Sequence, residues 1–80
     1  MARTKEENFL IAVYRHLAQL EDPETPIDPQ IIGKSIGYNP KSSLSMAKML
    51  HRTNFLRKSG EGFYTLSSHG EKLVRSLINE

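Results

Sequence analysis

The stretch IDPQIIGKSIGYNPKSS, near the middle of the chain, contains two helix-start signals in close succession. Asp28-Pro29 and Asn39-Pro40 each place an N-cap side chain before a proline, whose missing N–H costs nothing in the first turn of a helix. Gly37 lies between them, where a glycine can end a helix in the left-handed conformation. The chain is therefore expected to form a helix of about two turns, to turn sharply, and to begin a longer helix at once.

The segment before this stretch predicts another helix. Thr4 and Glu7 have the spacing of a capping box, so the helix is expected to begin at Thr4. Apolar residues then recur at helical intervals, and the pattern fades before EDPETP, whose two prolines indicate a loop. These apolar residues are Phe9, Leu10, Val13, Tyr14, Leu17 and Leu20. In the short second helix, the apolar side is expected to consist of Ile31, Ile32 and Ile36.

The third helix is expected to run to about Thr53, with Asn54 as a left-handed stop. The runs FLRK and FYTL then surround SGEG, a pattern that predicts a β-hairpin. Ser67 or Ser68 is expected to cap a last helix, whose apolar stripe is Leu73, Val74, Leu77 and Ile78. The predicted fold is mainly α with a small β-hairpin, in one domain over residues 1–80. Its order is helix, helix, turn, helix, hairpin, helix.

Charge is unevenly distributed along the chain, although the net charge is only +2. Residues 1–28 carry three basic and six acidic groups, and residues 61–80 carry two basic and three acidic groups. Residues 29–60 carry six basic groups and no acid. A cationic middle segment of this kind favours a polyanionic partner.

Within the third helix, an advance of about 100° per residue separates a buried side from a charged side. The expected buried side is Ser43, Met46, Ala47 and Leu50. The opposite, exposed side is Lys41, Ser45, Lys48 and Arg52. An ordinary solvated helix face mixes charges of both signs, whereas Lys48 and Arg52 lie four residues apart with the same sign. The stripe is therefore a candidate anion-binding surface.

Several classes of function have no support in the sequence. The chain has no cysteine, no apolar run of membrane-spanning length and no apolar signal region, so a cytoplasmic protein is expected. His16, His51 and His69 lack the spacing of metal ligands. No nucleophile motif, glycine-rich phosphate loop or carboxylate pair is present. We expect no enzyme activity, no metal or other cofactor, and no small-molecule ligand.

The segment IIGKSIGYNPKSSLSMAKMLHRTNFLRKSGEGFYTLSSHGEKLV resembles the winged helix-turn-helix of bacterial and archaeal transcription regulators, in particular the multiple-antibiotic-resistance and iron-dependent-repressor types. Gly37 matches the turn glycine and Asn39-Pro40 the cap of the recognition helix. Residues 55–58 match the strand after that helix, residues 59–62 the tip of the wing, and residues 64–70 the lead into the last helix. The first helix, ENFLIAVYRHL, resembles the opening helix of the iron-dependent type.

Three positions depart from the family pattern. Asn54 stands where a glycine is usual, and Gly33 stands where a small alanine is common. Ser43 takes a core-facing position that is usually apolar, and its hydroxyl can donate to a backbone carbonyl one turn earlier. The resemblance covers nearly the whole chain.

The resemblance implies a small transcription regulator that binds double-stranded DNA in a sequence-specific way. Residues 40–53 would form the recognition helix in the major groove, and residues 55–66 would form the wing on the DNA backbone or in the minor groove. Lys41, Ser42, Ser45 and Lys48 would face bases or flanking phosphates. Arg52, Arg57 and Lys58 would contact phosphates. Leu44 or Met49 could touch a thymine methyl, although both could also lie at the edge of the core, a position expected for Met49 more than for Leu44.

Two further expectations concern partners. A homodimer through the first and last helices is expected, because those helices carry more apolar residues than one small core needs. The residues concerned are Phe9, Leu10, Tyr14, Leu73, Leu77 and Ile78. The alternative function is a winged helix that serves as a protein–protein interaction module in a larger assembly. The acidic N-terminal third and Glu61, at the expected tip of the wing, favour this alternative.

Overall fold

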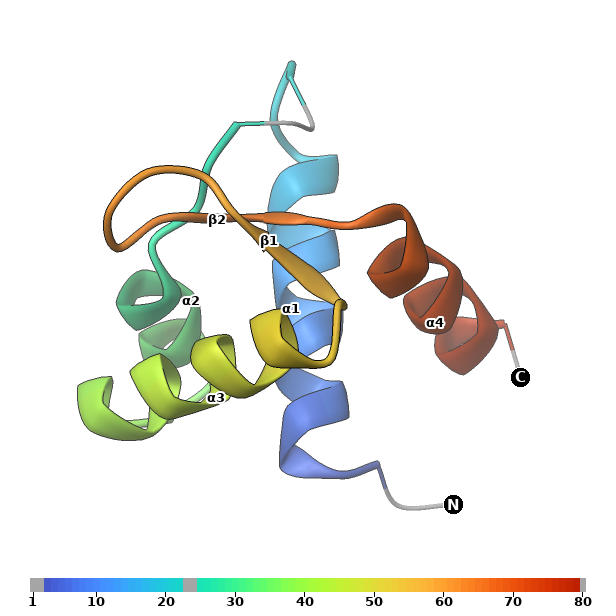
Figure 1. Cartoon of the computed structure of the whole chain (residues 1–80). Coiled ribbons are helices and arrows are strands. Elements are labelled where there is room, and N and C mark those ends of the chain that lie inside the picture. The colour runs from blue at the N-terminus through green and yellow to red at the C-terminus, as the bar shows by residue number, and fades with distance from the viewer. Residues whose placement is uncertain (1–2, 23–24, 80) are drawn as a thin grey trace.

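The computed structural model describes residues 3–22 and 25–79. These residues form α1 (Lys5–Ala18), α2 (Pro29–Ser35), α3 (Pro40–Arg52), β1 (Leu56–Lys58), β2 (Tyr64–Leu66) and α4 (Ser68–Ile78). The predicted class, mainly α with a small antiparallel hairpin, and the predicted order of elements are both confirmed. In Figure 1, α1 stands behind the other elements, α2 lies on the left, α4 lies on the right, and α3 and the hairpin lie in front.

All four helices begin at the caps that the sequence indicates. Thr4 and Glu7 form the capping box, in which the Thr4 hydroxyl accepts from the Glu7 N–H at 3.1 Å and a Glu7 carboxylate oxygen accepts from the Thr4 N–H at 2.8 Å. The side chains of Asp28, Asn39 and Ser67 cap α2, α3 and α4. Each cap satisfies an N–H group that would otherwise have no partner at the end of its helix.

The two predicted stops also have the expected conformation. Gly37, after α2, has a φ of 82°, and Asn54, after α3, has a φ of 72°. Asparagine is among the few residues besides glycine that adopt this left-handed region readily. Asn54 can therefore stand where the resemblance would place a glycine.

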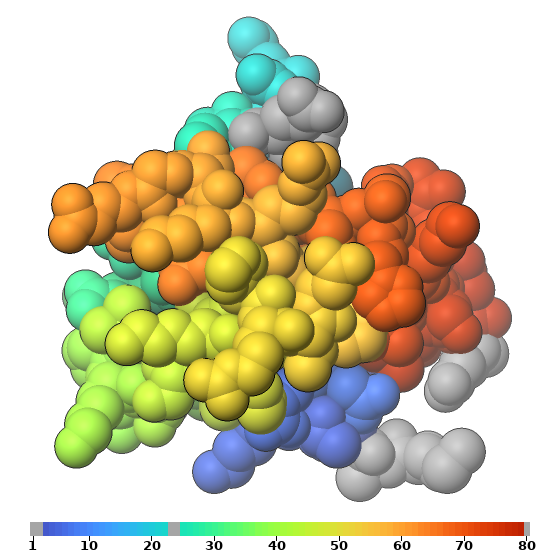
Figure 2. All heavy atoms as spheres, in the orientation of Figure 1, coloured from blue at the N-terminus to red at the C-terminus, as the bar shows by residue number. Residues whose placement is uncertain are grey.

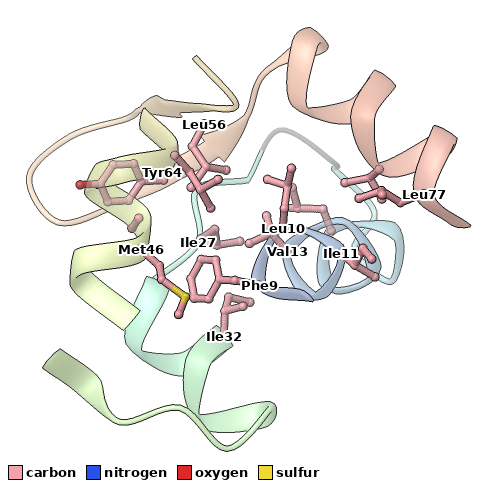
Figure 3. Close-up of a cluster of buried hydrophobic side chains, with 14 residues drawn as sticks. Phe9, Leu10, Ile11, Val13, Ile27, Ile32, Met46, Leu56, Tyr64 and Leu77 are labelled. Atoms are coloured by element: carbon pink, nitrogen blue, oxygen red, sulfur yellow. The ribbon is translucent and has the colours of Figure 1, made fainter. Parts of the chain in front are cut away.

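The hydrophobic core gathers side chains from every helix and from both strands (Figure 3). Phe9, Leu10 and Val13 of α1 are fully buried at its centre. The prediction for α2 was partly wrong, because Ile31 is 61% exposed. The buried residues of α2 are Pro29, Ile32 and Gly33. Ile32 and Gly33 follow Pro29 by three and four residues, so all three lie on one face of the helix. Ile31 is about 100° from Ile32 around the helix axis, and it points to solvent.

The apolar residues on which the homodimer prediction was based are largely buried within a single copy of the protein. Phe9 and Leu10 are 0% exposed and Leu77 is 9% exposed, so the prediction of surplus apolar surface was wrong for these three. Tyr14 and Leu73 are partly buried against the same core, and Ile78 is 36% exposed. The physical reason is that α4 packs against α1, so each helix covers the apolar face of the other.

One pairing has no counterpart in the sequence prediction. Ile27, just before α2, forms an antiparallel bridge with Tyr64 of β2. The Ile27 N–H donates to the Tyr64 carbonyl at 2.7 Å, and the Tyr64 N–H donates to the Ile27 carbonyl at 3.0 Å. The bridge ties the start of α2 to the side of β2 that does not pair with β1.

The contact between α2 and α3 depends on a missing side chain. Gly33 of α2 faces Ser43 of α3, which is 0% exposed. A Cβ atom on Gly33 would lie 2.7 Å from the Cβ of Ser43 and closer still to its hydroxyl oxygen. The Ser43 hydroxyl donates to the Asn39 carbonyl at 2.9 Å, as the sequence predicted. The close approach and the glycine turn together fix the angle between the two helices.

Candidate nucleic-acid interface

The two sides of α3 are those that the sequence predicted. Its buried residues are Ser43, Met46, Ala47 and Leu50. The residues exposed on the opposite side include Lys41, Ser45, Lys48 and Arg52. In the view of Figure 2, α3 lies at the front of the molecule with its outer side uncovered. We call these four exposed residues the α3 stripe.

The positive charge of the α3 stripe is not neutralised within the described part of the chain. None of Lys41, Lys48 and Arg52 forms an ion pair with a described residue. Lys48 and Arg52 lie one turn apart on the helix, where like charges cost a few tenths of a kcal/mol. The surface therefore carries a repulsion that an external anion would relieve.

The first turn of α3 is organised by its cap. The Asn39 side chain accepts from the Ser42 N–H at 2.7 Å, and Ser42 itself is partly buried. Further along, Met49 is 38% exposed whereas Leu44 is partly buried. Of the two apolar residues that could meet a thymine methyl, Met49 is thus the more accessible. The expectation that Met49, more than Leu44, lies at the edge of the core was wrong.

The segment after α3 is held by contacts at both ends of the hairpin. The Tyr64 ring lies 6.1 Å, between ring centroids, from that of His51 at the end of α3. The Ser67 hydroxyl donates to the Asn54 carbonyl at 2.7 Å and accepts from the Gly70 N–H at 2.9 Å. These contacts fix the hairpin relative to both α3 and α4.

A ring stack adds to this attachment. The rings of Phe55 and His69 lie nearly parallel, with centroids 4.6 Å apart. Phe55 immediately precedes β1, and His69 lies in the first turn of α4. The stack therefore ties the base of the hairpin to the last helix.

The two basic residues of β1 lie on opposite faces of the strand. Lys58 pairs with Tyr64 and shares the strand face of buried Leu56, whereas Arg57 points the other way. Arg57 instead lines a hollow that it shares with Tyr14 of α1 and with the start of α4. The structure thus separates two residues that the sequence placed together. Lys58 lies on the sheet face of its partner Tyr64, whose ring lies beside that of His51 in α3.

Sequence reasoning missed one residue next to the stripe. Glu6 of α1 lines an open hollow of about 400 Å³ together with Lys41, Ser42, Ser45 and Met49. Glu7 supplies the carboxylate of the capping box, so the Glu6 carboxylate has no capping role. No sequence signal links Glu6 to residues more than thirty positions away, because only the packing of α1 beside α3 brings them together. An acid at this point gives the surface a local negative site.

Residues 3–22 and 25–79 include no group of three or more His, Asp or Glu side chains that could hold a metal ion. No helix in this part of the chain is long and apolar enough to cross a bilayer. Comparison with protein-family models, with curated proteins and with solved structures gave no match.

Proposed function

We propose that this protein binds double-stranded DNA through α3, as a small transcription regulator of the winged helix-turn-helix kind. The observation that carries the proposal is the α3 stripe: three cations and a hydroxyl without an acid, on the uncovered side of a helix that follows a short helix through a tight turn. A helix of this kind fits the major groove, where side chains meet base edges and flanking phosphates.

The length of the stripe suits this role. Lys41 and Arg52 are eleven residues apart, which is about 16 Å along a helix at 1.5 Å per residue. That length is about half of one turn of duplex, or roughly five base pairs. Ser45 and Lys48, at the middle of the stripe, are the residues placed to meet base edges, since Lys can bind guanine and Ser reads bases permissively. Lys41 and Arg52, at its ends, are placed to meet phosphates.

The hairpin would serve as the wing, with Lys58 as its main phosphate contact because it lies on the sheet face of Tyr64, whose ring lies beside that of His51 in α3. Arg57, on the other face, would contribute less. Glu6 would oppose phosphates at the edge of the stripe, or accept a hydrogen bond from the amino group of a cytosine. The α3 stripe would then attract DNA, while the negative charge of Glu6 would weaken the binding of some DNA sequences.

A matched pair of variants tests the proposal. One variant replaces Lys41, Lys48 and Arg52 by alanine, and the control replaces Lys5, Lys72 and Arg75, which are exposed on other helices. Both variants lose three positive charges, so their net charge is the same. In a duplex mobility-shift assay at about 0.1 M salt, the stripe variant should bind at least about tenfold more weakly than the control.

Equal affinity of the two variants for duplex DNA would mean that binding depends only on net charge. It would contradict the proposal that α3 contacts the DNA bases. Absence of binding by the wild-type protein would favour the protein–protein module instead. Circular dichroism of both variants confirms that each is folded, which is expected because all six side chains are exposed.

A further inference from the structure

The tip of the hairpin carries an exposed aromatic ring and an acid. Phe63 is 46% exposed and is not part of the core or of the partly buried residues around it. Glu61, two residues earlier, is also exposed. Gly60 and Gly62 have φ values of 87° and 81°, and the Ser59 N–H closes the loop by donating to the Phe63 carbonyl at 3.0 Å. The tip is a poor partner for DNA, because residues 59–63 contain an acid and no cation.

A groove elsewhere on the protein has the complementary character. It runs along α1 and past the end of α2, with a volume of about 530 Å³. Ile11, Ala12 and Ile36 supply its apolar surface, and Ile11 is buried while the other two are partly buried. Arg3, Arg15 and His16 supply its polar edge, and none of the residues lining the groove is an Asp or a Glu.

The groove also has a fixed cation and a free one. The Arg3 guanidinium donates to the Leu77 carbonyl at 3.0 Å, so it is held against the end of α4. Arg15 forms no ion pair with a described residue. None of the lining residues comes from the hairpin, so the tip of the same copy does not occupy the groove.

We propose that the hairpin tip of one copy docks into the α1 groove of a second copy. The Phe63 ring would cover the apolar surface formed by Ala12 and Ile36, and the Glu61 carboxylate would lie beside Arg15. The groove is large enough for one aromatic ring, and an ion pair partly shielded from water at its edge fixes the orientation. Charge complementarity and the exposure of Phe63 both favour this occupant over an unrelated molecule.

Such a contact is head-to-tail, because two different surfaces meet. It extends into an open chain of copies unless the rotation between them closes a ring. This assembly differs from a two-fold homodimer through α1 and α4, because three of the six residues expected at that homodimer contact lie in the core. It also leaves the α3 stripe free, since no residue of α3 lines the groove.

The contact is small, so it belongs to the weak and transient class of interfaces. On DNA, two bound copies would raise each other's local concentration and make the contact effective. Where the proposed DNA binding also holds, head-to-tail copies would occupy sites repeated in the same direction, whereas a two-fold dimer would require an inverted repeat.

Sedimentation of three proteins without DNA tests the proposal independently of the DNA-binding function. The tip variant carries Glu61→Ser and Phe63→Ser, and the groove variant carries Arg15→Glu. All three changed residues are exposed, so both variants should fold, and circular dichroism checks this. Ile78→Ser removes another exposed apolar side chain, on α4, and serves as the control.

The wild-type protein and the Ile78→Ser control should form larger species as the concentration rises to about 1 mM, the range for contacts of about −4 kcal/mol. Each variant alone should associate at least about tenfold more weakly. A mixture of the two variants should form one-to-one pairs and nothing larger, because only the intact tip of the groove variant can enter the intact groove of the tip variant. A wild-type protein that stays monomeric, or a mixture that does not pair, would overturn the proposal.

Discussion

Replacing Gly33 by alanine should destabilise the protein, although alanine is the better helix former. The added Cβ would lie 2.7 Å from the Cβ of Ser43, a distance that real Cβ atoms do not adopt. Rotation of the Ser43 hydroxyl cannot relieve the clash, because the Ser43 Cβ is fixed by the backbone of α3. The two helices must therefore move apart at the point where they approach most closely.

Two opposing terms give the size of the effect. Removing a glycine from a helix stabilises it by about 1 kcal/mol. Overpacking a close core contact costs about 1–3 kcal/mol, and the upper end applies here because Ser43 is fully buried and hydrogen-bonded to Asn39. The free energy of unfolding should fall by about 2 kcal/mol, which lowers the melting temperature by roughly 8–16 °C in a domain of this size.

Urea denaturation measures this change, and a second substitution tests its cause. Ser43→Gly removes both obstructing atoms, so the double variant should be more stable than the sum of the two single effects by at least about 1 kcal/mol. If Gly33→Ala raised stability by about 1 kcal/mol, or if the two changes were simply additive, the close contact between α2 and α3 would be refuted.

Three other predictions concern the stability of the fold and the residues proposed to contact DNA. Ser67→Ala should lower the free energy of unfolding by about 1–2 kcal/mol in urea denaturation, because it removes the cap of α4 and the bond to the Asn54 carbonyl. Asn54→Gly should leave stability within about 0.5 kcal/mol of wild type, whereas Asn54→Val should lower it by about 1–2 kcal/mol, since a β-branched residue resists a φ of 72°. In binding-site selection, Lys48→Ala should change the preferred DNA sequence, whereas Lys58→Ala should weaken all sequences alike; the same preferred site with Lys48→Ala would make Lys48 a phosphate contact.

The sequence predicted well where the helices begin and end, because the residues that start and stop a helix act on backbone groups close to them in the chain. Caps such as Asp28 and Asn39 act on N–H groups two or three residues away, and the stop at Asn54 depends on a single φ angle. The buried side of α3 was likewise predicted, since helical spacing alone separates Ser43 from Lys48.

The features that the sequence could not predict all depend on tertiary packing. Ile31 and Ile32 are equally apolar, and only the direction in which α2 packs decides which of them is buried. The burial of Phe9 and Leu77 likewise depends on how closely α4 covers α1, so the surplus apolar surface could not be judged from a count of residues.

The same limit applied to the candidate site. Local spacing placed Lys41, Ser45, Lys48 and Arg52 on one side of α3, and that prediction was confirmed. Glu6 joins these residues only because α1 lies beside α3. Local spacing alone could also not tell which of the two basic residues of β1 would share the sheet face of Tyr64. Whether the stripe binds DNA stays a prediction.

The salt dependence of affinity for duplex DNA tests the central claim most directly. If the protein neutralises about four to six phosphates through its cationic middle segment, log affinity should fall against log salt with a slope of about −4 to −5. In the variant that lacks Lys41, Lys48 and Arg52, the slope should become shallower by about 2, because the phosphate contacts of Lys41 and Arg52 are lost. A flat response, an unchanged slope in the variant, or no binding by the wild-type protein at about 50 mM salt would contradict DNA recognition by α3.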